Sequence, residues 1–198
     1  LKARSATEHV CPKCGTVYTD ERTVAAYRGI LHNRLDKALL DLATAYAATG
    51  KLPYARAVER LFLQLADVYP EMERHDRWGR TGILAVVGGR RYAQHLDEAT
   101  SLIALSKTYD LIVSAPVLDK PERDKLADLL IDAANEIHKY QAFVDRKGIN
   151  NHITWFNAAY AAVGAATGSE TLLRRAVEGT HGLFFQLENS VTDDGIWY

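Results

Sequence analysis

The sequence is poor in the residues that cross-link or interrupt small folds. It has only two cysteines and five prolines in 198 residues, which excludes a disulfide-rich miniprotein and a proline-rich or collagen-like chain. It also lacks a charge imbalance, because 24 Lys and Arg residues nearly cancel 25 Asp and Glu residues. A domain that binds nucleic acid usually carries a clear basic excess, so we expect no nucleic-acid partner.

Long apolar runs are missing as well. The longest nearly apolar stretches, such as residues 158–166, are much shorter than the ~18 residues that indicate a membrane-spanning helix. We therefore expect no membrane span. Apolar residues make up 47% of the chain and charged residues 25%, which is typical of a globular domain that depends on its hydrophobic core.

Apolar residues recur with the period of an α-helix along most of the chain. Between residues 54 and 69 they are spaced by three and four positions, which places them on one helix face. Residues 24–45 show the same spacing and predict either one long helix or two helices broken near residues 29–33. No alternating strand pattern is found, so we predict an all-α fold. Further helices are predicted at residues 97–114, 122–143, 152–167 and 171–187.

Two segments of the chain are alike. They are AATGKLPYARAVERLFLQL at residues 47–65 and AATGSETLLRRAVEGTHGLFFQL at residues 165–187. Each contains a helix end, a Thr-Gly stop and a second helix with Ala-Val-Glu, which indicates repeated antiparallel helix pairs. Such pairs bury their apolar faces by stacking side by side, either in an open solenoid or in a closed toroid.

Residues 71–92 interrupt the helical order. They combine glycines and arginines, Arg80 among them, with Trp78 and Tyr92. Arginine and aromatic side chains together suit a sugar that carries carboxylate or sulfate, because guanidinium groups pair with oxyanions and rings stack on sugar faces. The alternative is a solvated loop in which the arginines pair with acidic residues of the same segment.

The segment GINNHITWF, residues 148–156, places two amides and an imidazole where a helix begins. Since Asn is a favoured N-cap, one interpretation of these residues is helix capping, with Trp155 and Phe156 in the core. In the alternative, Asn151 and His152 project together from the helix N-terminus. The partial positive charge of that end is useful wherever negative charge develops.

The N-terminal residues 1–20 carry a separate signal. The sequence CPKCG at residues 11–15 has the spacing of half a tetrahedral zinc site, and His9 is close enough to be considered as a third ligand. We predict a structural zinc ion at Cys11 and Cys14. A redox pair and a disulfide of an exported protein are the alternatives.

Four separated segments carry a resemblance to a known family. They are AYAATGKLPYARAVERL, RRYAQHLDEATSLIALSKTYDLI, NNHITWFNAAYAAVGAATG and the closing DDGIWY. Together they resemble the helical-toroid domain of the heparinase II/III-type polysaccharide lyases, a group that includes related alginate lyases. The resemblance implies that residues 21–198 form part of an (α/α) toroid that follows an N-terminal knuckle at residues 1–20.

The resemblance implies β-elimination on an anionic, uronate-containing polysaccharide, heparin-like or alginate-like, without an organic cofactor. Removing the C5 proton next to a carboxylate requires hydrogen-bond donors that neutralise this carboxylate. Asn151 matches the family's neutralising amide and His152 its adjacent catalytic histidine. The predicted substrate-binding residues are Gln94, His95, Arg80 and Trp155. Such enzymes are typically periplasmic or secreted.

The family's catalytic tyrosine follows an Asp-Gly-aromatic segment, which residues 194–197 represent here. Tyr198 comes too early to be this tyrosine, and the family's β-sandwich region is not represented. We therefore expect an incomplete lyase domain with little or no activity alone. The alternative function is a non-catalytic helical-repeat binding module with a zinc knuckle, in which capping and packing use up the side chains of Asn151 and His152.

Overall fold

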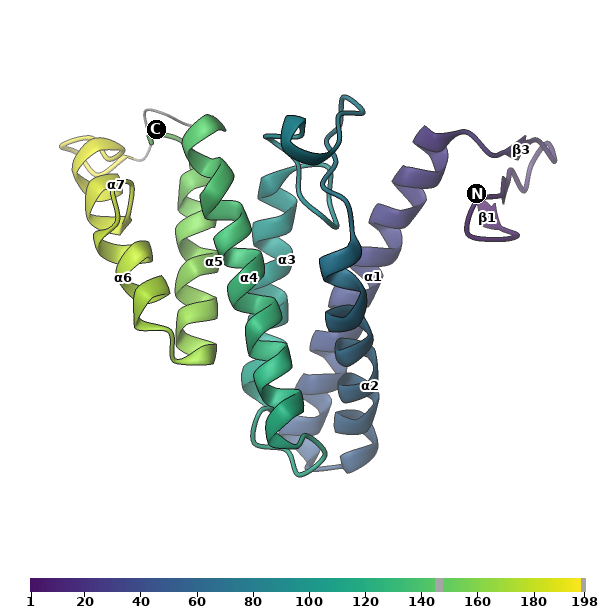
Figure 1. The fold of residues 1–198 in the computed structure, drawn as a ribbon, viewed down its shortest axis with the longest axis horizontal. Coiled ribbons are helices and arrows are strands. Elements are labelled where there is room, and N and C mark those ends of the chain that lie inside the picture. The colour runs from purple at the N-terminus through teal and green to yellow at the C-terminus, as the bar shows by residue number, and fades with distance from the viewer. Residues whose placement is uncertain (145–147, 197–198) are drawn as a thin grey trace.

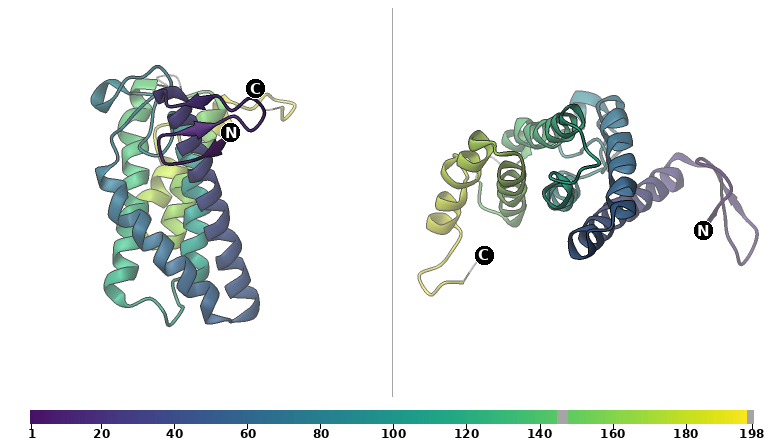
Figure 2. Two further views of the ribbon diagram at one scale, coloured as in Figure 1. Left: turned by 90° about the vertical axis from the view of Figure 1, so that its right-hand side faces the viewer. Right: turned by 90° about the horizontal axis from the view of Figure 1, so that it is seen from below.

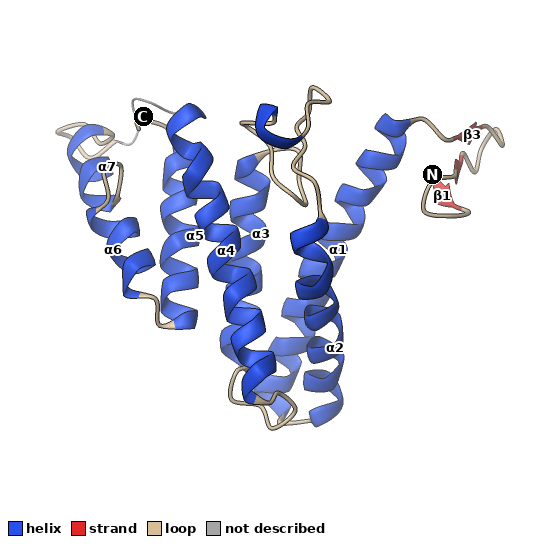
Figure 3. Ribbon diagram, in the orientation of Figure 1, coloured by secondary structure: helices blue, strands red, loops and turns tan. Residues whose placement is uncertain are grey.

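The fold is dominated by helices, with three two-residue strands near the N-terminus (Figures 1 and 3). A computed structural model describes residues 1–144 and 148–196. The predicted all-α fold class is confirmed. The helices are α1 (Glu21–Thr49), α2 (Leu52–Val68), α3 (His95–Ile112), α4 (Lys120–Val144), α5 (Asn151–Thr167), α6 (Glu170–Glu178) and α7 (Leu183–Asn189). The strands β1 (Lys2–Ala3), β2 (His9–Val10) and β3 (Val17–Tyr18) form one antiparallel sheet.

The six helices α1 to α6 form two layers of antiparallel pairs. Helices α1, α3 and α5 lie side by side in one layer, and α2, α4 and α6 lie in the other (Figure 2). Consecutive helices run in opposite directions (Figure 1). The described residues form an arc of helix pairs, while its closure into a toroid remains a prediction.

Helix α1 is a single helix, which decides between the two possibilities that its sequence left open. It begins after Asp20, whose carboxylate accepts a hydrogen bond of 2.9 Å from the backbone N–H of Thr23. It ends at Gly50, which has a φ of 67° and donates its N–H to the carbonyl oxygen of Tyr46. Gly29 lies inside the helix, where an isolated glycine costs only about 1 kcal/mol.

The core lies between the two layers. Phe62 of α2, Leu130 of α4 and Tyr160 of α5 are at most 1% exposed and belong to one cluster of buried residues. Alanines such as Ala43 and Ala99 are completely buried in the same cluster. Their small side chains allow the neighbouring helices to approach closely. Because a closely packed core leaves little room for one helix to move against another, the helix ends keep fixed relative positions.

The helix predicted over residues 171–187 is wrong, because the structure has two shorter helices, α6 and α7, in its place. The chain turns at residues 179–182, where the N–H of Gly182 donates to the carbonyl oxygen of Gly179 at 2.8 Å. A Cβ atom at Gly179 would lie 2.4 Å from the carbonyl oxygen of Arg175. The turn therefore requires glycine, although the apolar period continues across it.

The strands were not predicted, since two-residue strands are too short to produce an alternating pattern. Within the described part of the chain, no helix combines the length and the apolar character that crossing a bilayer requires.

Candidate functional site at the start of helix α5

Helix α5 begins with three polar residues that have different roles. Asn150 is the N-cap: its backbone is extended, and its side-chain oxygen accepts a hydrogen bond of 3.2 Å from the N–H of Ile153. Asn151 is the first residue of the helix, and its side chain is exposed. The capping function that sequence analysis considered for this segment therefore falls to Asn150. Trp155 follows Asn151 by four residues, on the same helix face, and is 44% exposed.

His152 lies beside a buried aromatic ring. Its imidazole is partly exposed, and its ring centroid is 6.4 Å from that of Phe156. Phe156 also contacts His95, the first residue of α3, at a centroid distance of 6.0 Å. The neighbouring starts of α3 and α5 thus bring His95 and His152 to the same aromatic ring.

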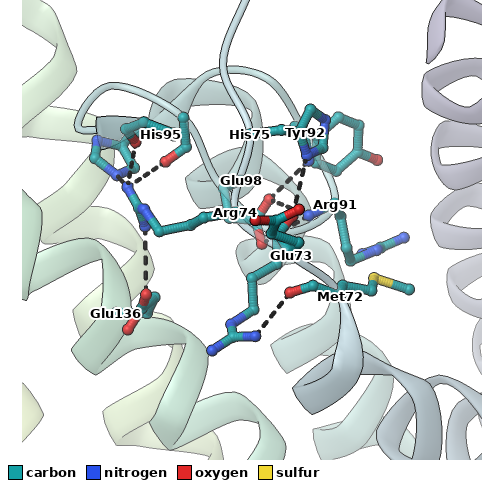
Figure 4. A network of polar contacts seen from close by, with 12 residues as sticks. Met72, Glu73, Arg74, His75, Arg91, Tyr92, His95, Glu98 and Glu136 are labelled. Atoms are coloured by element: carbon teal, nitrogen blue, oxygen red, sulfur yellow. Dashed lines mark hydrogen bonds and ion pairs between the residues drawn. The ribbon is translucent and has the colours of Figure 1, made fainter. Parts of the chain in front are cut away.

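His95 contacts the guanidinium group of Arg74, as Figure 4 shows. The Nη2 atom of Arg74 lies 2.6 Å from Nε2 of His95 and also donates to the carbonyl oxygen of Gly88 at 2.5 Å. Because arginine only donates hydrogen bonds, Nε2 of His95 must accept this one, so the proton of the neutral ring is on Nδ1. The guanidinium carbon of Arg74 lies 3.5 Å from the ring centroid of Tyr140.

The prediction that His95 contacts substrate does not fit its burial, because its side chain is only 2% exposed. Burial, followed by the charges of Arg74 and His152, lowers the pKa of His95 to about 3. His95 is therefore neutral and holds Arg74. The sequence alone does not distinguish Arg74 from the other arginines of residues 71–92, called here the Arg-rich segment, so this partner of His95 was not predicted.

The burial of His95 predicts an acid sensitivity of the fold. The unfolded chain protonates His95 below pH 6.5, its unperturbed pKa, whereas the folded protein resists protonation until about pH 3. Since the unfolded state then binds more protons, the contribution of His95 to the free energy of unfolding should fall by about 1.4 kcal/mol per pH unit as the pH drops below about 6. Urea unfolding at several pH values measures this slope.

His95→Gln should remove this part of the pH dependence while keeping an acceptor for Arg74. His32 has a pKa that burial lowers to about 4, so its own part of the slope should persist in the variant. An equal slope in the variant and the unaltered protein would contradict the assignment to His95.

The other predicted substrate-binding residues lie on different parts of the structure. Gln94 directly precedes α3, has an extended backbone and is partly exposed. Arg80 pairs with Asp76 at 2.6 Å, and its guanidinium carbon is 4.7 Å from the ring centroid of Trp78. The Arg-rich segment thus contains both features that sequence analysis considered, an internal ion pair and an exposed arginine–aromatic contact.

Buried polar groups hold the Arg-rich segment against the helices (Figure 4). The Glu98 carboxylate accepts hydrogen bonds from the N–H of Tyr92 at 3.0 Å and from the Tyr69 hydroxyl at 3.2 Å. Burial raises the pKa of Glu98, and the charge of Arg91 opposes this shift. Arg91 donates to Asp36 of α1 at 2.6 Å. The segment is therefore anchored to the helices at several points, which does not fit a solvated linker.

The two cysteines lie in the tight turn between β2 and β3. The N–H of Gly15 donates to the carbonyl oxygen of Cys11 at 3.0 Å, and both thiols are free. Hydrogen bonding from Thr16 lowers the pKa of Cys14. Across residues 1–144 and 148–196, no three His, Cys, Asp or Glu side chains are grouped as metal ligands. The zinc prediction thus rests on Cys11 and Cys14, and metal analysis of Cys14→Ser checks it.

Two of the predicted positions lie outside the described residues. They are Tyr198, predicted to be too early for the catalytic tyrosine, and Trp197 of the DDGIWY segment.

The fold and the site together define an all-α protein of paired helices, with an exposed amide, an imidazole and a buried arginine near the adjoining starts of two neighbouring helices. A model of the family described as alginate lyase matches residues 13–196. The chain belongs to the alginate lyase family.

A curated relative supports the same family. An alginate lyase of Stenotrophomonas maltophilia (strain K279a) is 26% identical over 171 residues, which cover 84% of this chain and 22% of the relative. The chain thus spans about a fifth of the length of that protein. The alginate lyase part of the resemblance seen in the sequence is confirmed.

Proposed function

We propose that this chain supplies part of the active site of a polysaccharide lyase that cleaves alginate or a related uronate polymer by β-elimination. Membership in the alginate lyase family supports the reaction class. The observation that carries the assignment of residues is the division of roles at the start of α5. Asn150 caps the helix, so the amide of Asn151 stays exposed beside His152.

The reaction explains why these groups are needed. A base removes the C5 proton, a double bond forms between C4 and C5, the C4–O bond breaks, and an acid protonates the departing oxygen. Negative charge accumulates on the uronate carboxylate in the transition state, so donors aimed at it lower the barrier. The Asn151 amide and the N-terminal end of α5 supply such donors. His152 adds a group that can donate to the carboxylate or transfer a proton.

The surroundings of this pair suggest how the sugar is held. Trp155, exposed on the same helix face as Asn151, would stack on a sugar ring. Gln94 is partly exposed at the start of α3 and would bind hydroxyl groups. Arg80 beside Trp78 would contact a carboxylate further along the polymer. Arg74 and His95 stay beneath the surface and position the aromatic residues around His152.

We further infer the fold that surrounds this site, the compartment in which the protein acts and a second substrate. The two layers of helix pairs support their continuation into an (α/α) toroid like that of the heparinase II/III-type lyases. Action in the periplasm or outside the cell would bring the protein to anionic polysaccharides. A heparin-like polymer is the second substrate to test after alginate.

Asn151→Ala and His152→Ala test the proposal in the longest natural protein that contains this chain. Each variant should lower kcat/KM on its polymer by about 100-fold, because a donor used in the transition state is lost. The rise in ultraviolet absorbance from unsaturated uronate, followed with alginate and with heparan sulfate, measures turnover and sorts the substrates.

Asn150→Ser is the matched control. It keeps a side-chain oxygen that can cap α5, so turnover should stay within a few-fold of the unaltered protein. Full turnover in Asn151→Ala and His152→Ala would refute the assignment of these residues. The absence of unsaturated product from every uronate polymer would favour the non-catalytic binding module.

A further inference from the structure

A cavity of about 380 Å³ lies beside the proposed active site but does not belong to it. It opens between α4, α5 and the turn that joins α6 to α7. None of the residues predicted to act on substrate lines it. The lining residues are His138, Lys139, Gln141, Asn157, Tyr160, Arg175 and the four residues of the turn at 179–182.

The cavity lies on a different side of α5 from Asn151. Tyr160 follows Asn151 by nine residues, which is about two and a half turns of an α-helix. Its side chain therefore points to the opposite side of α5. Trp155, in contrast, shares the face of Asn151. A ligand in the cavity would thus occupy a separate site rather than extend the one at the start of α5.

The charges around the cavity are positive. Lys139 and Arg175 line it together with no Asp or Glu side chain. None of the ion pairs found within the described residues uses either cation. Arg175 is nevertheless held in place, because it donates to the side-chain oxygen of Asn135 on α4 at 2.9 Å. Its guanidinium carbon lies 5.5 Å from the ring centroid of Tyr160.

The buried residues Tyr160, Gln141 and Asn157 form the deeper wall of the cavity with neutral polar groups that are already oriented, and the exposed His138 lies nearer its mouth. The Tyr160 hydroxyl donates to the amide oxygen of Gln141 at 2.8 Å, which fixes the orientation of this amide. The Asn157 amide nitrogen donates to the carbonyl oxygen of His181 at 2.7 Å. Burial and the charge of Arg175 lower the pKa of His138, which keeps its ring neutral. Fixed amides and a neutral imidazole suit sugar hydroxyl groups, which both donate and accept.

We propose that this cavity is a second binding site for a single uronate sugar, with Arg175 and Lys139 on its carboxylate and the amides and His138 on its hydroxyl groups. A volume of about 380 Å³ falls within the roughly 300–1,000 Å³ of small-molecule sites. Arginine binds carboxylates through parallel hydrogen bonds, which favours a carboxylated sugar over a neutral one. The choice of a uronate rests on the proposed function.

Calorimetric titration of the 198-residue chain with mannuronate tests the site. We expect saturable binding, with at least tenfold weaker affinity for mannose, which lacks the carboxylate, and for acetate, which lacks the ring. Arg175→Gln should weaken the binding of mannuronate by about tenfold or more, and Lys139→Gln by several-fold. Arg174→Gln is the matched control, because Arg174 is 73% exposed and pairs with Glu170 outside the cavity.

Amide NMR spectra locate the bound sugar. Mannuronate should shift the signals of residues 179–182 and of Arg175, and these shifts should persist in Asn151→Ala. No saturable binding, equal affinity for acetate, or shifts confined to residues 151–155 would overturn the proposal. If Arg175→Gln unfolds, the exposed Lys139→Gln variant carries the test. Turnover does not enter these measurements, so failure of the lyase assignment and failure of this site are distinguishable.

Discussion

Asp36→Ala is expected to lower the free energy of unfolding by about 3–5 kcal/mol, because it removes the carboxylate that balances the charge of a buried guanidinium group. Arg91 is 3% exposed and Asp36 is 6% exposed. The carboxylate of Asp36 accepts hydrogen bonds from Arg91 at 2.6 Å and from the Tyr92 hydroxyl at 2.9 Å. Together with Glu98, which accepts hydrogen bonds from the backbone N–H groups of Arg91 and Tyr92, Asp36 holds the end of the Arg-rich segment. Urea unfolding at neutral pH measures the loss of stability in Asp36→Ala.

Two variants separate burial from charge in this experiment. Asp41→Ala removes the partner of Lys37 from an exposed ion pair on the same helix, so it should cost less than about 1 kcal/mol. The double variant Asp36→Leu with Arg91→Met removes both buried charges and should be more stable than Asp36→Ala alone. Equal losses for Asp36→Ala and Asp41→Ala would contradict the importance of burial.

Gly148→Ala is expected to destabilise the protein by about 2–5 kcal/mol for two combined reasons. Gly148 has a φ of 71°, which side chains with a Cβ atom rarely adopt. A Cβ atom there would also lie 2.2 Å from Cδ2 of His181, far inside van der Waals contact. Thermal or urea unfolding measures the loss. Because Gly148 comes three residues before Asn151, turnover should fall with stability.

Gly168→Ala isolates the backbone part of this effect. Gly168 has a similar φ of 75°, but no atom lies within 4 Å of an added Cβ atom. Its replacement should therefore cost only the roughly 1–2 kcal/mol of left-handed backbone strain. If Gly148→Ala is no worse than Gly168→Ala, the contact with His181 contributes nothing.

The sequence predicted the helices well because their apolar residues follow the helical period. The start of α5 was also predicted, since Asn at a helix start and the aromatic residues after it are local signals. These local signals left two possibilities for the asparagines of this segment, helix capping or a side chain that projects from the helix N-terminus. The structure assigns the cap to Asn150, because its extended backbone directs its side chain to the N–H of Ile153.

The parts that were not predicted depend on contacts between distant residues. Arg74 is buried because its guanidinium group contacts two residues that are distant in the sequence. His95 lies 21 residues further along the chain, and Glu136 lies 62 residues further along. No local pattern distinguishes it from the exposed Arg77. The break between α6 and α7 was missed because the apolar period continues across Gly179 and Gly182.

The alternation of helix direction polarises one rim of the molecule. Helices α1, α3 and α5 all begin toward the upper rim in Figure 1, whereas α2 and α4 run toward this rim and α4 ends there. Helix starts carry partial positive charge and helix ends partial negative charge. The electric field at this rim therefore points from the α1–α3–α5 layer toward the other layer, and it would guide a long polyanion onto the layer that carries Asn151. Capture of such a polymer should slow as ionic strength rises.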